Sequence, residues 1–178
     1  MYPLVLLVLR WSNQSRVNIM SSDLESIPAA EHEEFFAAVD AACKKAIWCA
    51  VATVVSTASG PKPRVRIVHP TWEGDRLWIA TAPQSPKALQ IKANPFVDIQ
   101  YQVAPPDFIH VMVRGRAELI TDQATRTQAW NAIDYDLTEF GTTNAEDPNF
   151  QPIRVTPTRV ELSEMFGSIN KRIWRARA

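Results

Sequence analysis

The amino-acid sequence predicts a mainly β fold, a six-stranded antiparallel β-barrel with helices packed against its outside. Segments rich in valine, isoleucine and threonine recur along the chain, and short turns separate them. Only a few helical segments intervene between these strands. This order favours an antiparallel barrel over a parallel sheet whose strands are joined by helices.

The expected elements follow one another in a definite order. Helices are expected over residues 31–45, 87–93 and 124–133, and strands over 48–56, 64–69, 76–81, 97–103, 109–120, 153–155 and 159–165. Asp122 is the expected N-cap of the third helix. Gly115 lies in the middle of a long strand, where it predicts a bulge or a bend of the barrel.

Composition limits the possible partners. The chain has 178 residues, of which 46% are hydrophobic, enough for one domain with a sizeable core. The formal net charge is zero, whereas a protein that binds duplex nucleic acid usually carries a basic excess. We therefore expect no nucleic-acid partner. Cys43 and Cys49 form no disulfide or zinc pattern, and we expect them to stay reduced in the cytoplasm.

The two ends of the chain are expected to lie outside the barrel. Pro3–Leu9 is apolar but short, because a membrane-spanning helix needs about 20 residues, so we expect no membrane association. The residues that follow Met20 look like an ordinary protein start, and the segment before it is expected to add little to the fold. The expected division is a flexible extension over 1–28, the barrel domain over 29–170 and a basic tail over 171–178.

Several common functional motifs are absent from the sequence. The five glycines build neither a dinucleotide-binding G-x-G-x-x-G nor a P-loop, and the G-x-S-x-G motif of hydrolases is missing. The three histidines lie far apart in sequence, and no metal site is expected. Asp134 and Asp136 lack the remaining ligands of a calcium loop, so we interpret their segment as a solvated loop.

One cluster of residues predicts a site for a phosphate group. Arg64 and Arg66 are two residues apart on a strand and so project from one face. Thr81 ends a later strand, and Ser85-Pro86-Lys87 then begins a helix. A helix N-terminus attracts anions, and Lys87 is unfavourable there unless an anion is bound. The alternative is that Ser85 only caps the helix and that Lys87 is only a surface residue.

These residues also carry a family resemblance. Arg66-Ile67-Val68, Trp78-Ile79-Ala80-Thr81, Ser85-Pro86-Lys87-Ala88, Gln90, Asn94-Pro95 and Val113-x-Gly115 together resemble the pyridoxamine 5'-phosphate oxidase-like superfamily of FMN-binding split barrels. The resemblance extends over roughly residues 35–160. It implies a Greek-key split barrel and a homodimer with an FMN at each of two interface sites.

The resemblance also implies which residues meet the cofactor. Arg66, together with Arg64 on the same face, is expected at the flavin or its phosphate, and the backbone of Ile67 and Val68 at the flavin ring. The positions of Thr81, Ser85 and Lys87 match those that hold the phosphate. His110 falls where the oxidases carry a glutamine that contacts the flavin, and its alternative is an ordinary barrel residue at a solvent edge.

The resemblance does not extend to the substrate segment of the oxidases. Their C-terminal arginine-histidine-aspartate-arginine type segment is absent here, so oxidation of pyridoxamine phosphate itself is not expected. The chain is more similar to the general stress protein and uncharacterised branches. The expected function is therefore an FMN-dependent oxidoreductase that moves two electrons to or from a small molecule, with NADPH as a candidate electron donor. No catalytic acid, base or nucleophile stands out.

Alternatives remain open at this stage. A non-catalytic flavin-binding protein, a deazaflavin-dependent reductase and a haem-binding protein could use the same barrel, with His69 or His110 as the axial ligand of haem. Trp130 is expected in the core, and Trp174 either in the tail or over the partner subunit's site. The sequence leaves open whether the loop over residues 134–150 closes over the pocket.

Overall fold

The computed structural model describes residues 26–177. The expectations for Pro3–Leu9, for Met20 and for most of the N-terminal extension concern residues outside this range. Within it, none of the helices combines the length and the apolar character needed to cross a membrane.

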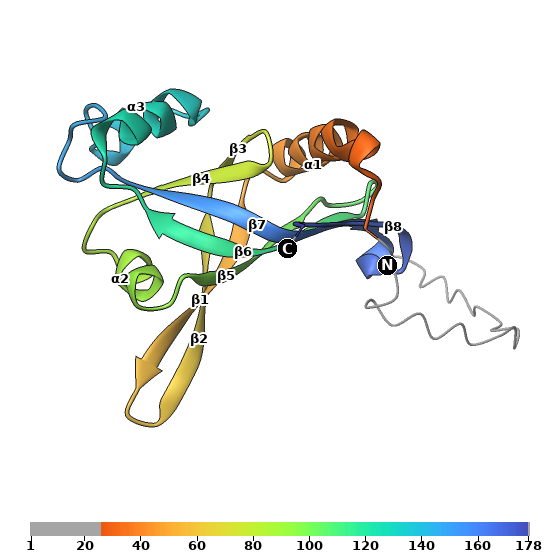
Figure 1. The fold of residues 1–178 in the computed structure, drawn as a ribbon, viewed down its shortest axis with the longest axis horizontal. Helices are drawn as coiled ribbons and strands as arrows, with labels where there is room; N and C mark the ends of the chain where they lie inside the picture. Colours follow the sequence, from red (N-terminus) through yellow and green to blue (C-terminus); the bar gives the residue numbers. More distant parts are fainter. Residues whose placement is uncertain (1–25, 178) are drawn as a thin grey trace, which may run out of the picture.

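The fold is mainly β, as predicted, and every strand pair is antiparallel (Figure 1). The strands are β1 (Cys49–Thr57), β2 (Gly60–Val68), β3 (Thr71–Glu73), β4 (Arg76–Thr81), β5 (Phe96–Gln102), β6 (Ile109–Leu119), β7 (Gln151–Glu164) and β8 (Ile169–Arg175). Their order in the sheet is β2-β1-β5-β6-β7-β4-β3, with β8 paired to β7. The sheet therefore has free ends at β2 and β3, which is consistent with a split barrel.

The predicted number of six strands was wrong, because the described residues form a sheet of eight. The two closing strands predicted separately are one strand of 14 residues, β7. The three-residue strand β3 is too short to give an alternating pattern. The expected basic tail instead forms β8, in which Ile173 is 1% exposed and the Trp174 ring packs 5.2 Å from that of Phe36. Its basic residues obscured this apolar pair in the sequence.

The start of the described chain lies along β8. The Ile27 amide donates to the Ile173 carbonyl at 2.8 Å, and the Arg175 amide donates to the Ser26 hydroxyl at 3.0 Å. These two bonds join residues close to both ends of the described chain. The expected domain boundaries near residues 28 and 170 therefore fall within hydrogen-bonded structure.

The predicted helices are present, with the expected caps. They are α1 (His32–Ala46), α2 (Pro86–Ala93) and α3 (Gln123–Ala132), accompanied by the short 3₁₀ helices η1 (Ala29–Glu31), η2 (Leu137–Phe140) and η3 (Met165–Gly167). The Asp122 carboxylate accepts the Thr125 amide at 2.9 Å at the start of α3. The Ser85 hydroxyl accepts the Ala88 amide at 3.2 Å at the start of α2.

Two groups of buried side chains hold the elements together. The larger lies inside the sheet and beneath α1, where Phe35, Phe36 and Val39 are buried against strand residues such as Tyr101. The smaller lies beneath α3 and includes Trp78, Ile120, Ala129 and Phe150, with Trp130 packed against it as predicted. Because Leu77 and Ile79 belong to the larger group and Trp78 to the smaller, β4 separates the two. The end of β4 is thereby fixed in place.

The bulge predicted at Gly115 is also present. The pairing of β6 with β7 shifts register between Arg114 and Gly115. A Cβ atom at Gly115 would lie 2.7 Å from the carbonyl oxygen of Thr156, so no larger residue fits without moving the backbone.

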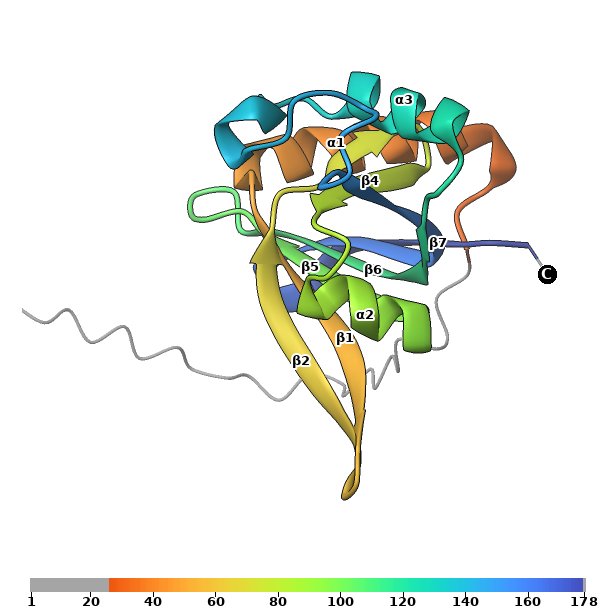
Figure 2. The ribbon, with the colours of Figure 1, turned by 90° about the vertical axis from the view of Figure 1, so that its left-hand side faces the viewer.

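The β1–β2 hairpin projects from the body of the molecule, and α2 lies against β1 (Figure 2). The predicted phosphate-binding residues come from β2, from the end of β4 and from the start of α2. The fold thus brings together three segments that are separate in sequence.

Candidate functional site

The start of α2 is held by a short chain of hydroxyl groups. The Thr81 hydroxyl, at the end of β4, donates to the Ser85 hydroxyl at 2.8 Å. Ser85 in turn caps the helix, and Pro86 occupies its first turn. In a helix, the first amides have no partner within the helix, and Lys87 contributes one of them. The sequence therefore folds into a helix N-terminus with two hydroxyl groups beside it.

Two cationic side chains meet at this helix start. The Arg66 guanidinium donates to the Thr53 hydroxyl at 2.8 Å and to the Gln90 side-chain oxygen at 3.1 Å, which fixes its position against α2. Burial lowers the pKa of Lys87, and the neighbouring charge of Arg66 lowers it further. Within residues 26–177 neither cation forms an ion pair with a carboxylate. The positive charges of Arg66 and Lys87 therefore favour the binding of an anion at the start of α2.

A cavity of about 640 Å³ opens beside this helix start. Its lining comes from the residue just before β1, the end of β2, the end of β4, the start of α2 and the segment after α3. The lining residues are Trp48, Ile67, Val68, His69, Ala80, Thr81, Ala82, Lys87, Tyr135, Leu137, Phe140, Gly141, Thr142 and Asn149. The volume lies in the usual range for small-molecule and cofactor sites. Ile67, Val68, Thr81 and Lys87 were predicted from the sequence to meet a cofactor, and the fold gathers all four here.

Arg66 and Ser85 support the cavity from behind its lining. Ser85 bonds to the lining residue Thr81, and the charge of Arg66 lowers the pKa of the lining residue Lys87. Arg64 behaves differently, although it shares a strand face with Arg66. Its side chain is exposed on the projecting hairpin and donates to the Pro63 carbonyl at 2.8 Å.

His110 lies in a different cavity from Lys87. It is 6% exposed on β6 and lines a smaller cavity of about 240 Å³ together with Glu161, Ser163 and Lys171. Among the described residues, neither its Nε2 atom nor the Ser163 hydroxyl has a hydrogen-bond partner. A single chain therefore does not bring His110, which was predicted to contact the flavin, to the cavity that Ile67, Val68 and Lys87 line. His69, the other histidine considered as a haem ligand, lines the large cavity, so the two histidines also lie in different cavities.

The loop over residues 134–150 forms one wall of the large cavity. The Arg126 guanidinium holds this loop by donating to the carbonyls of Ala145 at 2.9 Å, Asp147 at 2.8 Å and Phe150 at 2.6 Å. Amide hydrogen bonds from Thr143 and Asn149 lower the pKa of the Asp147 carboxylate, which ties the loop to itself. The sequence left open whether the loop reaches the pocket; the structure shows that it supplies several lining residues and is pinned by Arg126.

Reasoning from the sequence missed the aromatic part of the cavity. Trp48 was interpreted as the first residue of a buried strand, but its side chain is 65% exposed. Tyr135 lies in the acidic stretch that was interpreted as a solvated loop, and Phe140 lies in the loop whose position the sequence left open. A sequence signal existed, because large aromatic side chains in a polar loop need a partner, but their distance in sequence from Lys87 hid the relationship.

Comparison with known proteins places this arrangement in a family. A family model described as pyridoxamine 5'-phosphate oxidase matches residues 35–164. The chain belongs to this family. The resemblance predicted from the sequence is thereby confirmed. A search among curated proteins finds no match.

Solved structures share the fold at low sequence identity. A protein of Clostridium acetobutylicum related to general stress protein 26 is 16% identical, with a TM-score of 0.61 over 80% of this chain and 95% of its own. A nimC/nimA family protein from the same organism is 15% identical, with a TM-score of 0.62 over 82% of this chain and 96% of its own. A pyridoxamine 5'-phosphate oxidase-related, FMN-binding protein of Nostoc punctiforme is 18% identical, with a TM-score of 0.54 over 86% and 99%.

Proposed function

We propose that the chain is an FMN-dependent oxidoreductase of the pyridoxamine 5'-phosphate oxidase family that exchanges two electrons with a small molecule. The observation that carries the proposal is the pair of cations Arg66 and Lys87, without a carboxylate partner in residues 26–177, at the start of α2. A phosphate monoester supplies the missing negative charge, and the adjoining cavity has room for a ring system. The residues present thus fit a phosphorylated flavin.

Each residue at the helix start has its own role in binding. Lys87 would supply an ammonium group and a free backbone amide to the phosphate, and Arg66 a second positive charge. The Ser85 hydroxyl already accepts from Thr81 and from Ala88, so its own proton is free to donate to a phosphate oxygen. The backbone of Ile67 and Val68 would lie along the ring. The flavin, when bound, supplies the hydride and electron chemistry.

We further propose that the functional unit is a homodimer in which His110 completes the site of the other subunit. Ile67 and Met112 lie in one row across the outer face of β2, β1, β5 and β6, and are 68% and 43% exposed. Val65 and His110 lie on the same face in neighbouring rows. Because Ile67 also lines the large cavity, a second copy docked on this face would bring its own His110 towards the flavin.

The proposal is tested by comparing FMN with riboflavin, which lacks the phosphate. Fluorescence titration of the apoprotein should show FMN binding about 100-fold more tightly, because charge-assisted contacts contribute roughly 1.5–3 kcal/mol each. The substitution K87A should reduce this preference about tenfold or more. Lys92 lies exposed at the other end of α2, so K92A is the matched control and should retain the preference. Equal affinities for FMN and riboflavin would contradict the proposed site.

Catalysis is tested separately from binding. NADPH is the proposed electron donor. The proposed location is the cytoplasm, where Cys43 and Cys49 would stay reduced; both cysteines are free and buried. Bleaching of the flavin absorbance by NADPH without oxygen, followed by its return on adding an organic acceptor, would support an enzyme. Stable flavin binding without reduction by NADPH or by other common donors would instead indicate a storage or sensing role. Chromatography of the released cofactor distinguishes FMN from a deazaflavin.

A further inference from the structure

A second cavity, of about 600 Å³, lies between α1 and the strands β6, β7 and β8. None of its lining residues lines the large cavity, so it is separate from the proposed flavin site. On the helix side its lining is Ala38, Ala41, Ala42 and Lys45, which recur at intervals of three and four residues and so form one face of α1. This face extends along about 10 Å of the helix, since each residue adds about 1.5 Å. We call this space the α1 cavity.

The walls of the α1 cavity suit an aliphatic chain. On the sheet side, Ile109 of β6 and Leu162 of β7 complete the apolar lining that the alanines of α1 begin. Among residues 26–177, no aromatic side chain contributes to this lining. A linear hydrocarbon chain gains close contacts along such walls, whereas a planar ring system finds no ring on which to stack. The lining therefore favours a straight, saturated ligand.

A buried hydroxyl group lines the same cavity without a partner. Ser163 directly follows Leu162, which is paired with Arg172 across β7 and β8. Ser163 is 2% exposed and lines both the α1 cavity and the smaller cavity of His110. Among the described residues, its hydroxyl has no hydrogen-bond partner. Because a buried hydroxyl without a partner is costly, this group indicates a polar ligand atom beside Arg172.

Arg172 carries a positive charge without a counterion in the α1 cavity. Its side chain is half-buried, and its guanidinium lies 5.6 Å from the centroid of the Phe35 ring. Within residues 26–177, no carboxylate forms an ion pair with it. A guanidinium can bind a carboxylate through two parallel hydrogen bonds. Arg172 and the Ser163 hydroxyl together therefore fit a carboxylate group.

The other charged side chains of the lining change this balance little. The Lys45 ammonium lies 3.1 Å from a carboxylate oxygen of Asp107. The Lys171 ammonium lies 3.4 Å from a carboxylate oxygen of Glu161. Neither of these acids lines the cavity, but the half-buried Glu164 does. The charge of Glu164 opposes a bound anion, so removing that charge should strengthen the binding of one.

We infer that the α1 cavity binds a straight-chain aliphatic carboxylate. Arg172 and Ser163 would bind the carboxylate, and the chain would lie along the alanines of α1 against Ile109 and Leu162. The inference goes beyond the proposed function, because it requires neither the flavin nor the dimer. It gives each chain a second small-molecule site, for an aliphatic acid.

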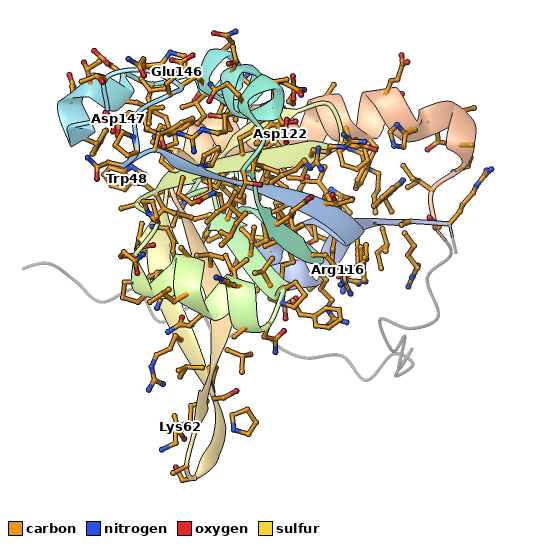
Figure 3. All side chains as sticks on the ribbon, turned by 60° about the vertical axis from the view of Figure 1, so that its left-hand side comes forward. Trp48, Lys62, Arg116, Asp122, Glu146 and Asp147 are labelled. Atoms are coloured by element: carbon orange, nitrogen blue, oxygen red, sulfur yellow. The ribbon has the colours of Figure 1, made fainter. Side chains whose placement is uncertain are left out.

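The test compares octanoate with octanamide, which has the same chain without the charge, and with acetate, which has the charge without the chain. Calorimetric titration of the parent protein should give octanoate an affinity at least about tenfold higher than either. R172M keeps an apolar side chain against Phe35, so it should weaken octanoate binding about tenfold and leave octanamide binding unchanged. Arg116 lies over the Phe96 ring in a similar way, at 4.9 Å, but at the surface of β6 and outside the cavity (Figure 3), so R116M is the matched control.

Three further variants test the other parts of the site. S163A should weaken octanoate binding about threefold to tenfold, yet leave the free protein no less stable, because the hydroxyl has no partner to lose. E164Q should strengthen octanoate binding about threefold, since it removes a negative charge near the carboxylate. Ala37 and Ala41 are both exposed on α1, but only Ala41 lines the cavity, so A41W should block octanoate and A37W should not.

The outcomes separate this inference from the proposed function. K87M should bind octanoate as the parent protein does, because Lys87 lines the other cavity. If K87M loses octanoate and R172M does not, the acid binds at the start of α2 and the inference is overturned. Equal affinities for octanoate and octanamide, or no saturable binding of octanoate, also overturn it. A failure of FMN to bind would count against the proposed function alone, because the octanoate titration needs no flavin.

Discussion

The positive charge of Arg66, which is hydrogen-bonded to Gln90 of α2, lowers the pKa of Lys87 at the start of that helix, and within residues 26–177 neither cation forms an ion pair with a carboxylate. Arg66 cannot turn away, because Thr53 and Gln90 hold its guanidinium. Two neighbouring positive charges at a positive helix end repel one another. The folded protein without ligand therefore carries a local electrostatic cost that a bound anion removes.

The first prediction concerns stability against pH without ligand. Burial and Arg66 lower the pKa of Lys87 in the folded state below its ordinary value of 10.5. Between these two pKa values the unfolded chain binds more protons than the folded one, so Lys87 makes stability rise with pH in this window. Below the lowered pKa the cost is fully present. Urea unfolding from pH 7 to 10.5 should show this rise, and K87M should have a flatter profile.

Lys92 provides the comparison for this experiment, because K92M removes a lysine from the same helix without touching the cation pair. It should keep the slope of the parent protein. Saturating FMN should stabilise the parent protein and K92M to the same extent, and K87M less. Identical pH profiles for K87M and K92M would show that the two cations do not interact.

The second prediction separates two arginines that the sequence could not distinguish. R66A should weaken FMN binding about tenfold or more, because it removes a positive charge beside the phosphate. R64A should change the affinity by less than about threefold, since Arg64 is exposed and donates to the neighbouring Pro63 carbonyl. Titration of the two apoproteins with FMN measures both. Equal losses would mean that the hairpin moves Arg64 to the site on binding.

The sequence predicted the start of α2, where we propose that the phosphate binds, because its signals are local. Ser85, Pro86 and Lys87 are adjacent, and a helix cap needs only neighbouring residues. Gly115 was recognised for a similar reason, because an interior glycine in a strand signals a bulge. Such features follow from short-range backbone chemistry, and they were confirmed.

The aromatic part of the large cavity, formed by Trp48, Tyr135 and Phe140, could not be predicted, because it depends on contacts between distant segments. Trp48 immediately precedes β1, whose first residue is buried, so the local pattern placed Trp48 in a buried strand. Only the position of the 134–150 loop shows that Trp48 and Phe140 share one cavity. Strand β8 was missed for a related reason, since its pairing with β7 and its contact with Phe36 are both tertiary.

The third prediction concerns the bulge that bends β6. The substitution G115A places a Cβ atom 2.7 Å from the Thr156 carbonyl oxygen and 3.0 Å from a Val155 methyl group. Because backbone must move to relieve the first contact, we expect a loss of about 1–3 kcal/mol in unfolding free energy. Urea denaturation measures this loss. An unchanged midpoint would mean that β6 and β7 separate locally at little cost.

The fourth prediction concerns the wall of the cavity. Arg126 satisfies the carbonyls of Ala145, Asp147 and Phe150, and R126M would leave these three groups without that donor. The Asp147 carbonyl keeps the Phe150 amide as a donor at 2.9 Å, so the expected loss of about 2–4 kcal/mol comes mainly from the carbonyls of Ala145 and Phe150. Limited proteolysis should also cut the 134–150 loop faster. Its matched control is R154M, which breaks a single ion pair with exposed Glu118 and should cost less than about 1 kcal/mol. If R126M were no less stable than R154M, the hydrogen bonds of Arg126 would not be what holds the loop against the cavity.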